Sequence, residues 1–556
     1  MRSDSYNFTH PFLRKIESFK QDSICLIAQD QSHTYGELLD STRNALNLLN
    51  SIKANSVIGI IGDYDLKTLA FFLACVEKGF IVTPLSASLI PKDSIFSPML
   101  QSYIKEGQID YLFYNNTLHS TRSIDKKHSI IASLQANHTS GLILFSSGST
   151  GKPKAIVHNL NTLLQGFLEK KPKRINILLF LMFDHIGGLN TLFNVLSLGA
   201  CGITLKNRKD MQEIAKSIQD YKIALLPASP SLLHLFLLSN PTQLYDLSSL
   251  RLITYGTEKM SDSLLAKLKN AFPKVRFHQT FGASEIGITQ TTTKDNFIHL
   301  DNMEYKIVNN ELFIKSHTNA LGYLNSDNSV FDNEGYFATG DLVEVKTING
   351  EEYIKIIGRA KEVINVGGEK VIPQEVEGVL LQIPFISDCV VYGESNAITG
   401  QSVSVKVVLD SNHYIKSSKA ESANLDSKNT DSNTAEVSLS DFSGFQSKGE
   451  GSYLRGNDRA LSAESAKSTK ETTQVTQNLE LKKYIRTFCK DKLAPFKIPS
   501  KVIVVESLEV SERFKKLRLT NGGGGVTLYE SYYYAIYRYK SLSFRHISIC
   551  ENLQCA

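Results

Sequence analysis

Several familiar sequence signals are missing from this chain of 556 residues. Its seven cysteines include no CxxC pair, and no histidine cluster has zinc spacing, which argues against a structural metal and for reduced thiols. No run reaches the roughly eighteen consecutive apolar residues of a membrane span. The first residues lack the apolar core of a signal peptide. We therefore expect a cytoplasmic protein without a membrane span.

Concentrated charge is also missing. The formal net charge is +5, and the basic residues are scattered rather than gathered in a stripe, so nucleic acid is not an expected partner. With 42% hydrophobic and 21% charged residues, the composition is that of an ordinary globular protein. The length predicts several domains rather than one.

The most informative feature that is present is the segment FSSGSTGKPK at residues 145–154, which follows the apolar run GLILF. Gly148 and Gly151 let the backbone approach an anion closely. Hydroxyl donors and cations accompany them: Ser146, Ser147, Ser149, Thr150, Lys152 and Lys154. We therefore predict a phosphate-binding loop after a buried strand. It differs from the loop of kinases and GTPases, because Pro153 stands where GxxxxGK[ST] requires Ser or Thr.

The chain up to about residue 357 alternates strand patterns with helical ones. Strands are predicted at residues 56–63, 80–85, 223–230 and 251–256, and helices at 65–79 and 261–272. This order predicts α/β layers in which helices cover the sheets. Ligands of such sheets bind at the carboxyl ends of the strands, where the predicted turns lie.

A change of composition follows near residue 410. Residues 411–477 are rich in Ser, Lys, Glu, Asn and Thr and too polar to form a core, so we predict a disordered insert. A helix and then a strand are predicted in residues 481–510. Residues 521–556 form an atypical tail, which contains four glycines at 522–525 near its start. The glycines suggest either a guanine tract with a shifted reading frame, as in a phase-variable gene, or a genuine extension.

Four further motifs follow the loop in a fixed order. They are TFGASEIG at 280–287, GYFATGDLVEV at 335–345, GRAKEVINVGGEKVIPQEVEGVL at 358–380 and SERFKKLR at 511–518. The second places an aspartate, Asp341, after a glycine, where we expect it to be exposed. In this order, over residues 10–410 and 478–520, the chain resembles the adenylate-forming superfamily. That superfamily contains acyl-CoA synthetases, peptide-synthetase adenylation domains and luciferases.

The resemblance implies an ATP site. The loop residues Ser146, Ser147, Gly148, Ser149, Thr150, Gly151 and Lys154 would bind the phosphates and steer the leaving pyrophosphate. Glu285 would hold Mg²⁺, with Ser284 in place of the usual threonine. Asp341 would accept both ribose hydroxyls through its two oxygens, and Arg359 would add a second ribose contact. Gly256, Thr257 and Glu258 match the segment that lies along adenine.

The resemblance also implies the reaction. A small carboxylic acid attacks the α-phosphorus of MgATP, and Thr150, Glu285 and a C-terminal lysine assist. Lys515 is that lysine, with Arg518 in register, although Phe514 replaces the usual glycine and Lys516 is the alternative. His185 corresponds to a histidine beside the acyl pocket, or else is a core histidine.

The implied architecture is a large multilayered N-terminal α/β domain followed in the chain by a small mobile α+β domain. The AMP-binding adenylation domain would be residues 1–357, and the C-terminal lid domain residues 358–520, interrupted by the insert. The lid would rotate about a hinge at Lys361. Gly367 and Gly368 would then let a pantetheine arm, of CoA or of an acyl carrier protein, pass close to the backbone.

Two other functions remain open at this stage. Asp184 lies beside the position where amino-acid-activating enzymes bind the α-amino group, although its spacing to Gly199 fits that alignment poorly. Phe514, the insert and the tail are also compatible with a non-catalytic nucleotide-binding protein. The sequence identifies neither the acid nor the oligomeric state.

Overall fold

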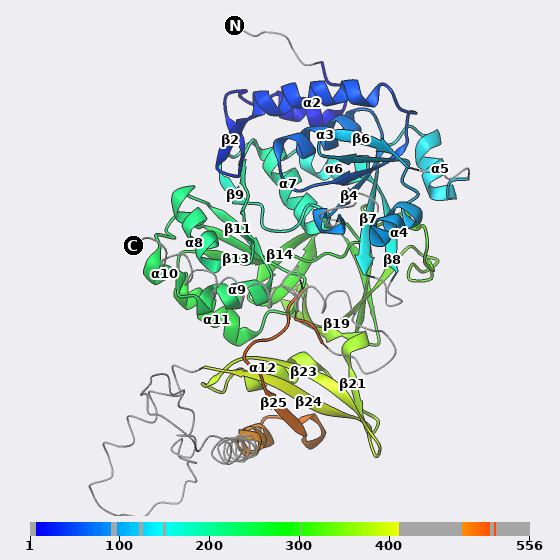
Figure 1. Ribbon diagram of the computed structural model, residues 1–556. Coiled ribbons are helices and arrows are strands. Elements are labelled where there is room, and N and C mark those ends of the chain that lie inside the picture. Colours follow the sequence, from blue (N-terminus) through cyan, green and yellow to red (C-terminus); the bar gives the residue numbers. More distant parts are fainter. Residues whose placement is uncertain are drawn as a thin grey trace, which may run out of the picture.

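The computed structural model describes residues 7–90, 97–121, 126–147, 152–287, 289–301, 303–410, 481–511 and 516–518 (Figure 1). The predicted insert at 411–477 and the tail at 521–556 lie outside the described residues. So do residues 148–151 of the predicted phosphate loop and residues 512–515, which include Phe514 and Lys515.

Two seven-stranded sheets form the first part of the chain; the first is parallel except for one edge pair, and the second contains as many antiparallel as parallel pairs. The first has the order β13-β12-β11-β9-β10-β1-β2. Its strands are β1 Ile24–Ala28, β2 Gln31–Thr34, β9 Asn176–Leu178, β10 Cys201–Ile203, β11 Leu225–Ala228, β12 Leu252–Tyr255 and β13 Arg276–Gln279. The second has the order β18-β8-β7-β4-β3-β5-β6. Its strands are β3 Val57–Ile61, β4 Ile81–Leu85, β5 Tyr111–Tyr114, β6 Thr117–Ser120, β7 Gly141–Ser147, β8 Pro153–Asn159 and β18 Gly322–Tyr323.

Helices cover both faces of each sheet. The helices between the sheets are α1 Pro11–Glu17, α2 Tyr35–Leu49, α3 Leu66–Glu77, α6 Leu160–Leu168 and α7 Ile186–Leu198. Outside the first sheet lie α8 Met211–Asp220, α9 Pro230–Leu238 and α11 Asp262–Ala271, with the short α10 Pro241–Leu244 nearby. Outside the second lie α4 Pro98–Glu106 and α5 Ser129–Ala136, with the 3₁₀ turn η1 Ala87–Leu89. The predicted multilayered α/β class is confirmed.

Strand periodicity explains this layering. In β3, Ile58 and Ile60 belong to the core between the sheets, whereas Val57 and Ile61 belong to the core on the outer face. All four are buried, as expected of a strand that is covered on both sides. Helix α3 begins where the Asp65 side chain accepts the backbone N–H groups of the first turn.

A third, antiparallel sheet follows, with the order β14-β15-β20-β19-β17-β16. Its strands are β14 Gln290–Lys294, β15 Phe297–Asp301, β16 Glu304–Val308, β17 Glu311–Lys315, β19 Phe337–Ile348 and β20 Glu351–Arg359. Phe281 and Ile286, from the segment after β13, pack into the core of this sheet. The TFGASEIG segment is therefore held between the parallel layers and the third sheet.

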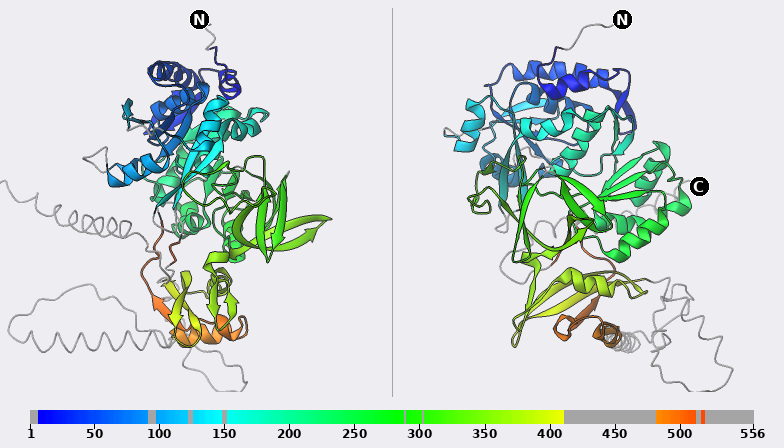
Figure 2. Two further views of the ribbon diagram at one scale, coloured as in Figure 1. Left: turned by 90° about the vertical axis from the view of Figure 1, so that its right-hand side faces the viewer. Right: turned by 180° about the vertical axis from the view of Figure 1, so that it is seen from behind.

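The last part of the chain has its own sheet and core, below the others in Figure 1 and visible from two further sides in Figure 2. The strands are β21 Ile364–Val366, β22 Glu369–Val371, β23 Ile386–Asn396, β24 Gly400–Leu409 and β25 Lys501–Val504. The helices are α12 Pro373–Leu380 and a helix at 481–490, with 3₁₀ turns η2 Ala360–Glu362 and η4 Pro495–Lys497. Within the described ranges, no helix has the length and apolar character needed to cross a membrane.

Candidate active site

The predicted phosphate loop joins two antiparallel strands. β7 and β8 pair with Ser146 opposite Lys154 and Ser147 opposite Pro153, so the ladder continues to both ends of the loop. Gly148, Ser149, Thr150 and Gly151 lie outside the described residues. The Nζ atom of Lys154 lies 5.5 Å from the ring centroid of Tyr323 in β18, the strand beside β8. The lysine of the loop is thus placed next to an aromatic side chain.

Tyr323 also holds the predicted metal ligand. Its hydroxyl donates a hydrogen bond of 2.9 Å to Oε1 of Glu285. Burial and the nearby Glu285 raise the pKa of Tyr323 well above its usual value, so the hydroxyl stays protonated and remains a donor. One tyrosine therefore contacts both Lys154 and Glu285. Sequence analysis missed Tyr323, because a lone tyrosine in GYLN matches no motif.

The donor set at Glu285 fits Mg²⁺. Among the residues that the structure describes, no three His, Cys, Asp or Glu side chains gather as a metal site. Mg²⁺ needs no such group when it arrives with a nucleotide, since it is commonly bound by one or two carboxylates together with phosphates and water. Glu285 is a carboxylate of the kind that could take this role, and the Tyr323 hydroxyl fixes the direction of one of its oxygens.

His158 contacts the backbone of the segment that contains Glu285. It is fully buried on β8. It lies four residues after Lys154, and so on the same face of the strand. Its Nε2 lies 2.6 Å from the carbonyl oxygen of Ser284, so Nε2 carries a proton and donates it. Burial lowers the pKa of His158 to about 4. The histidine is therefore neutral at pH 7 and fixes the backbone beside Glu285.

This burial predicts a dependence of stability on pH. Because the folded pKa of His158 is lower than the unfolded one, the unfolded chain binds more protons between about pH 6.5 and 4, and stability falls as pH falls through that window. The loss reaches about 3 kcal/mol, at 1.36 kcal/mol for each pKa unit. Urea unfolding of the wild type and of His158→Gln at pH 7 and pH 4.5 measures it. We expect a smaller pH effect in the variant, and equal pH effects would contradict the assignment.

The predicted ribose pair forms on two neighbouring strands. Asp341 in β19 lies opposite Arg359 in β20, and Nε of Arg359 is 2.6 Å from Oδ1 of Asp341. The expectation of an exposed aspartate was wrong, because Asp341 is only 5% exposed. It belongs to a strand rather than to a turn, and its N–H donates to Oγ1 of Thr339. Burial and the guanidinium together fix the direction of the carboxylate.

The predicted adenine segment is a tight turn after β12. A Cβ atom on Gly256 would lie 2.6 Å from Oγ1 of Thr280 and 2.7 Å from its carbonyl oxygen, so the turn packs directly against the start of TFGASEIG. Thr257 has a φ of 69°, a conformation that is uncommon for residues other than glycine. Glu258 accepts the N–H of Ser231 in the first turn of α9, at 3.1 Å.

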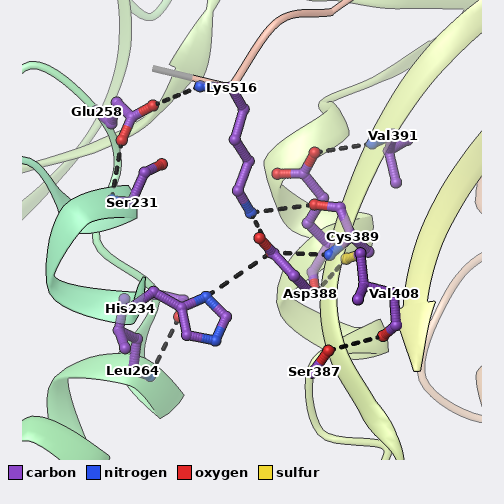
Figure 3. A network of polar contacts seen from close by, with 12 residues as sticks. Ser231, His234, Glu258, Leu264, Ser387, Asp388, Cys389, Val391, Val408 and Lys516 are labelled. Atoms are coloured by element: carbon purple, nitrogen blue, oxygen red, sulfur yellow. Dashed lines mark hydrogen bonds and ion pairs between the residues drawn. The ribbon is translucent and has the colours of Figure 1, made fainter. Parts of the chain in front are cut away.

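The C-terminal segment reaches this turn. The backbone N–H of Lys516 donates to Oε1 of Glu258, at 3.1 Å (Figure 3). The side chain of Lys516 points the other way, with Nζ 2.5 Å from Oδ1 of Asp388 and 3.1 Å from the carbonyl oxygen of Cys389. Arg518 pairs with Glu362 and Glu377. The segment that follows Lys515 is thus bound by both parts of the molecule.

The remaining predicted residues occupy three separate places. His185 is the N-cap of α7, where its Nδ1 accepts the N–H of Gly187 at 3.3 Å. Lys361 is exposed in η2, directly after β20. Gly367 and Gly368 form the turn between β21 and β22, with φ of 60° and 91°. An acyl-pocket role for His185, the hinge and the pantetheine passage stay predictions.

Comparison with known proteins identifies the family. The family model described as "AMP-binding enzyme" matches residues 97–324. 4-Coumarate–CoA ligase-like 9 of Arabidopsis thaliana is 25% identical over 411 residues, 64% of this chain and 72% of that protein. Probable 4-coumarate–CoA ligase 2 of Dictyostelium discoideum is 26% identical over 481 residues, 73% and 86% of the two chains. These matches confirm the resemblance to the adenylate-forming superfamily.

Other relatives of this chain are also named as CoA ligases or acyl-CoA synthetases. They include acyl-CoA synthetase 7 of Caenorhabditis elegans, 29% identical over 313 residues, which are 50% of this chain and 57% of that one. The share of the relative that is aligned varies: for 4-coumarate–CoA ligase 4 of Arabidopsis thaliana, the alignment spans 51% of that protein.

Solved structures agree on the fold. An anthranilate CoA ligase in complex with anthranoyl-AMP superimposes with a TM-score of 0.66 at 16% identity, covering 92% of this chain and 96% of that one. The o-succinylbenzoate CoA synthetase of Bacillus subtilis gives a TM-score of 0.62 at 18% identity, with 93% and 99% covered.

Proposed function

We propose that this enzyme activates a small carboxylic acid with MgATP and then transfers the acyl group to the pantetheine thiol of CoA. The observation that carries the proposal is the bond from the backbone of Lys516 to Glu258. This bond joins Lys516, the residue after the predicted catalytic lysine in sequence, to the turn predicted to lie along adenine, and so supports the proposal. A protein that merely binds a nucleotide has no need of this arrangement.

In the first step, a carboxylate oxygen bonds to the α-phosphorus, the bond from that phosphorus to the bridging oxygen breaks, and pyrophosphate leaves. Both reactants are anions, so the site must supply positive charge and hold them in line. Lys154 would supply positive charge to the phosphates, and Lys515 would supply it at the reacting centre. Asp341 and Arg359 would hold the ribose, and Glu285 would hold Mg²⁺, which would supply further charge neutralisation when bound with ATP.

In the second step, the thiol sulfur attacks the acyl carbonyl, the thioester forms and AMP leaves. The lid domain rotates about Lys361 and brings the turn at Gly367 and Gly368 to the thiol channel. Both glycines are exposed and have positive φ, so a side chain at either position would narrow the passage and strain the turn. We favour CoA over a carrier protein because the relatives are named as CoA ligases. We also propose a cytoplasmic location, where CoA and ATP are both available.

Pyrophosphate release with MgATP tests the proposal directly. The panel contains 4-coumarate, other aromatic acids, short and long aliphatic acids and amino acids, each with and without CoA. We expect one acid class to stimulate release, and CoA to stimulate it further. Stimulation by amino acids alone would instead establish an amino-acid-activating enzyme, and stimulation without a CoA effect would favour a carrier protein.

Glu285→Gln makes the same assay specific to the site. The substitution keeps the size of the side chain and removes its charge, so we expect pyrophosphate release to fall by at least about tenfold, as is usual when a charged contact is lost. Glu304→Gln, on the exposed surface of β16, is the matched control and should keep the wild-type rate. Equal rates for the two variants would exclude Glu285 as the Mg²⁺ ligand.

A further inference from the structure

Four residues meet where the C-terminal domain faces the N-terminal layers, and we call them the domain junction: His234, Glu258, Asp388 and Lys516 (Figure 3). His234 belongs to α9 and Asp388 to β23. Nδ1 of His234 lies 3.8 Å from Oδ1 of Asp388, and Nζ of Lys516 lies 2.5 Å from the same oxygen. The backbone of Lys516 meets Glu258 from the other side.

The junction is largely shielded from water. The side chains of Lys516 and Asp388 are 16% and 17% exposed, and that of His234 is 14% exposed. Burial disfavours the charge of Lys516, but the carboxylates of Asp388 and Glu377 outweigh it and raise the pKa of the lysine above its usual value. A charged lysine held in this way is costly to release, because either partner alone would be a buried unpaired charge.

The same contacts decide between the two lysines. Lys516 forms an antiparallel bridge with Val510, so its own backbone is extended. A lysine whose ammonium group is bound to Asp388 and to the carbonyl oxygen of Cys389 does not face the nucleotide. Lys516 therefore acts as an anchor, and the catalytic role falls to Lys515.

We propose that Asp388 is a positioning residue for adenylation: it binds Lys516, and so fixes the C-terminal segment that carries the proposed catalytic lysine against Glu258. Arg518, bound to Glu362 and Glu377 of the same domain, secures the other end of the segment. The inference rests on the proposed function. It adds that the segment is held by a charge pair which belongs to the lid domain and moves with it.

Asp388→Asn tests this by separating the two half-reactions. Pyrophosphate release should fall roughly tenfold, the lower end of what misplacing a reacting group costs. Thioester formation from CoA and a supplied acyl-adenylate should stay within about twofold of wild type, whereas a damaged fold would slow both steps. Glu394→Gln, which breaks the Lys501 pair on the same strand β23, is the control and should change neither step.

Removing Asp388 alone leaves the charge of Lys516 buried and unpaired, so a double variant is needed as a control. Asp388→Asn combined with Lys516→Met removes both charges together. If the two residues act as one contact, the double variant should lose no more adenylation rate than Lys516→Met alone. Additive losses would overturn the inference. Lys516→Arg, which can still bind a carboxylate, should retain most of the rate.

A distance measurement tests the inference even if no acid stimulates pyrophosphate release. Spin labels at Leu244→Cys in α10 and Ile398→Cys in the β23–β24 turn are suitable, since these side chains are 64% and 94% exposed. Cys550 and Cys555 are changed to serine in the full chain. We expect Asp388→Asn to lower the population at the wild-type distance, with and without ATP. An unchanged distribution of spin-label distances would overturn the positioning role. Absence of pyrophosphate release by the wild type with every acid of the panel would instead overturn the proposed function.

Discussion

Lys515→Ala should lower pyrophosphate release with MgATP and acid by about 10³-fold, the upper range for removal of one preorganised charge from an active site. The reason is that attack of a carboxylate on ATP joins two anions, and a lysine at the reacting phosphate offsets the charge that builds up. Thioester formation from a supplied acyl-adenylate should continue near the wild-type rate, because the proposed domain rotation precedes that step and would remove the need for this lysine.

Lys516→Met is the informative comparison for this result. If Lys516 is an anchor bound to Asp388, its loss should cost about tenfold rather than 10³-fold in adenylation. A Lys515→Ala enzyme that still releases pyrophosphate at the wild-type rate would refute the assignment. Loss of both half-reactions in Lys515→Ala would point to unfolding instead, which the circular dichroism spectrum of the variant checks.

The parallel layers follow closely from local sequence patterns. The strand predicted at residues 56–63 is observed at Val57–Ile61, and the helix predicted at 65–79 is observed at Leu66–Glu77. The prediction succeeded because a run of β-branched residues is followed by a capping aspartate and a helical apolar pattern. The helix predicted at 261–272 is likewise observed at Asp262–Ala271.

The contacts that organise the site are less predictable, because they join residues far apart in the chain. Tyr323 and Glu285 are 38 positions apart, and Lys516 and Asp388 are 128 apart. No periodicity encodes such pairs. The burial of Asp341 escaped prediction for a related reason: a threonine, a glycine and an aspartate suggest a turn, but pairing with β20 extends the strand through them.

Asp341→Ala should lower kcat/KM for ATP by about 10²- to 10⁴-fold, mostly through a higher KM. The carboxylate is proposed to accept both ribose hydroxyls, and a hydrogen bond to a charged group contributes about 1.5–3 kcal/mol. Arg359 does not replace it, since a guanidinium donates hydrogen bonds and cannot accept them. The side chain of Arg359 is 46% exposed, so water can solvate the guanidinium once Asp341 is lost, and the fold should survive.

Comparison of ATP with 2′-deoxy-ATP makes this prediction specific to the ribose. The wild type should prefer ATP, because the deoxynucleotide leaves one oxygen of a buried carboxylate without its hydroxyl, whereas Asp341→Ala should use the two nucleotides with similar kcat/KM. Glu344→Ala, on an exposed position of the same strand β19, should keep the wild-type preference. If Asp341→Ala still discriminated as strongly as the wild type, the ribose would be bound elsewhere, and the Asp341–Arg359 pair would serve to join β19 to β20 rather than to bind the nucleotide.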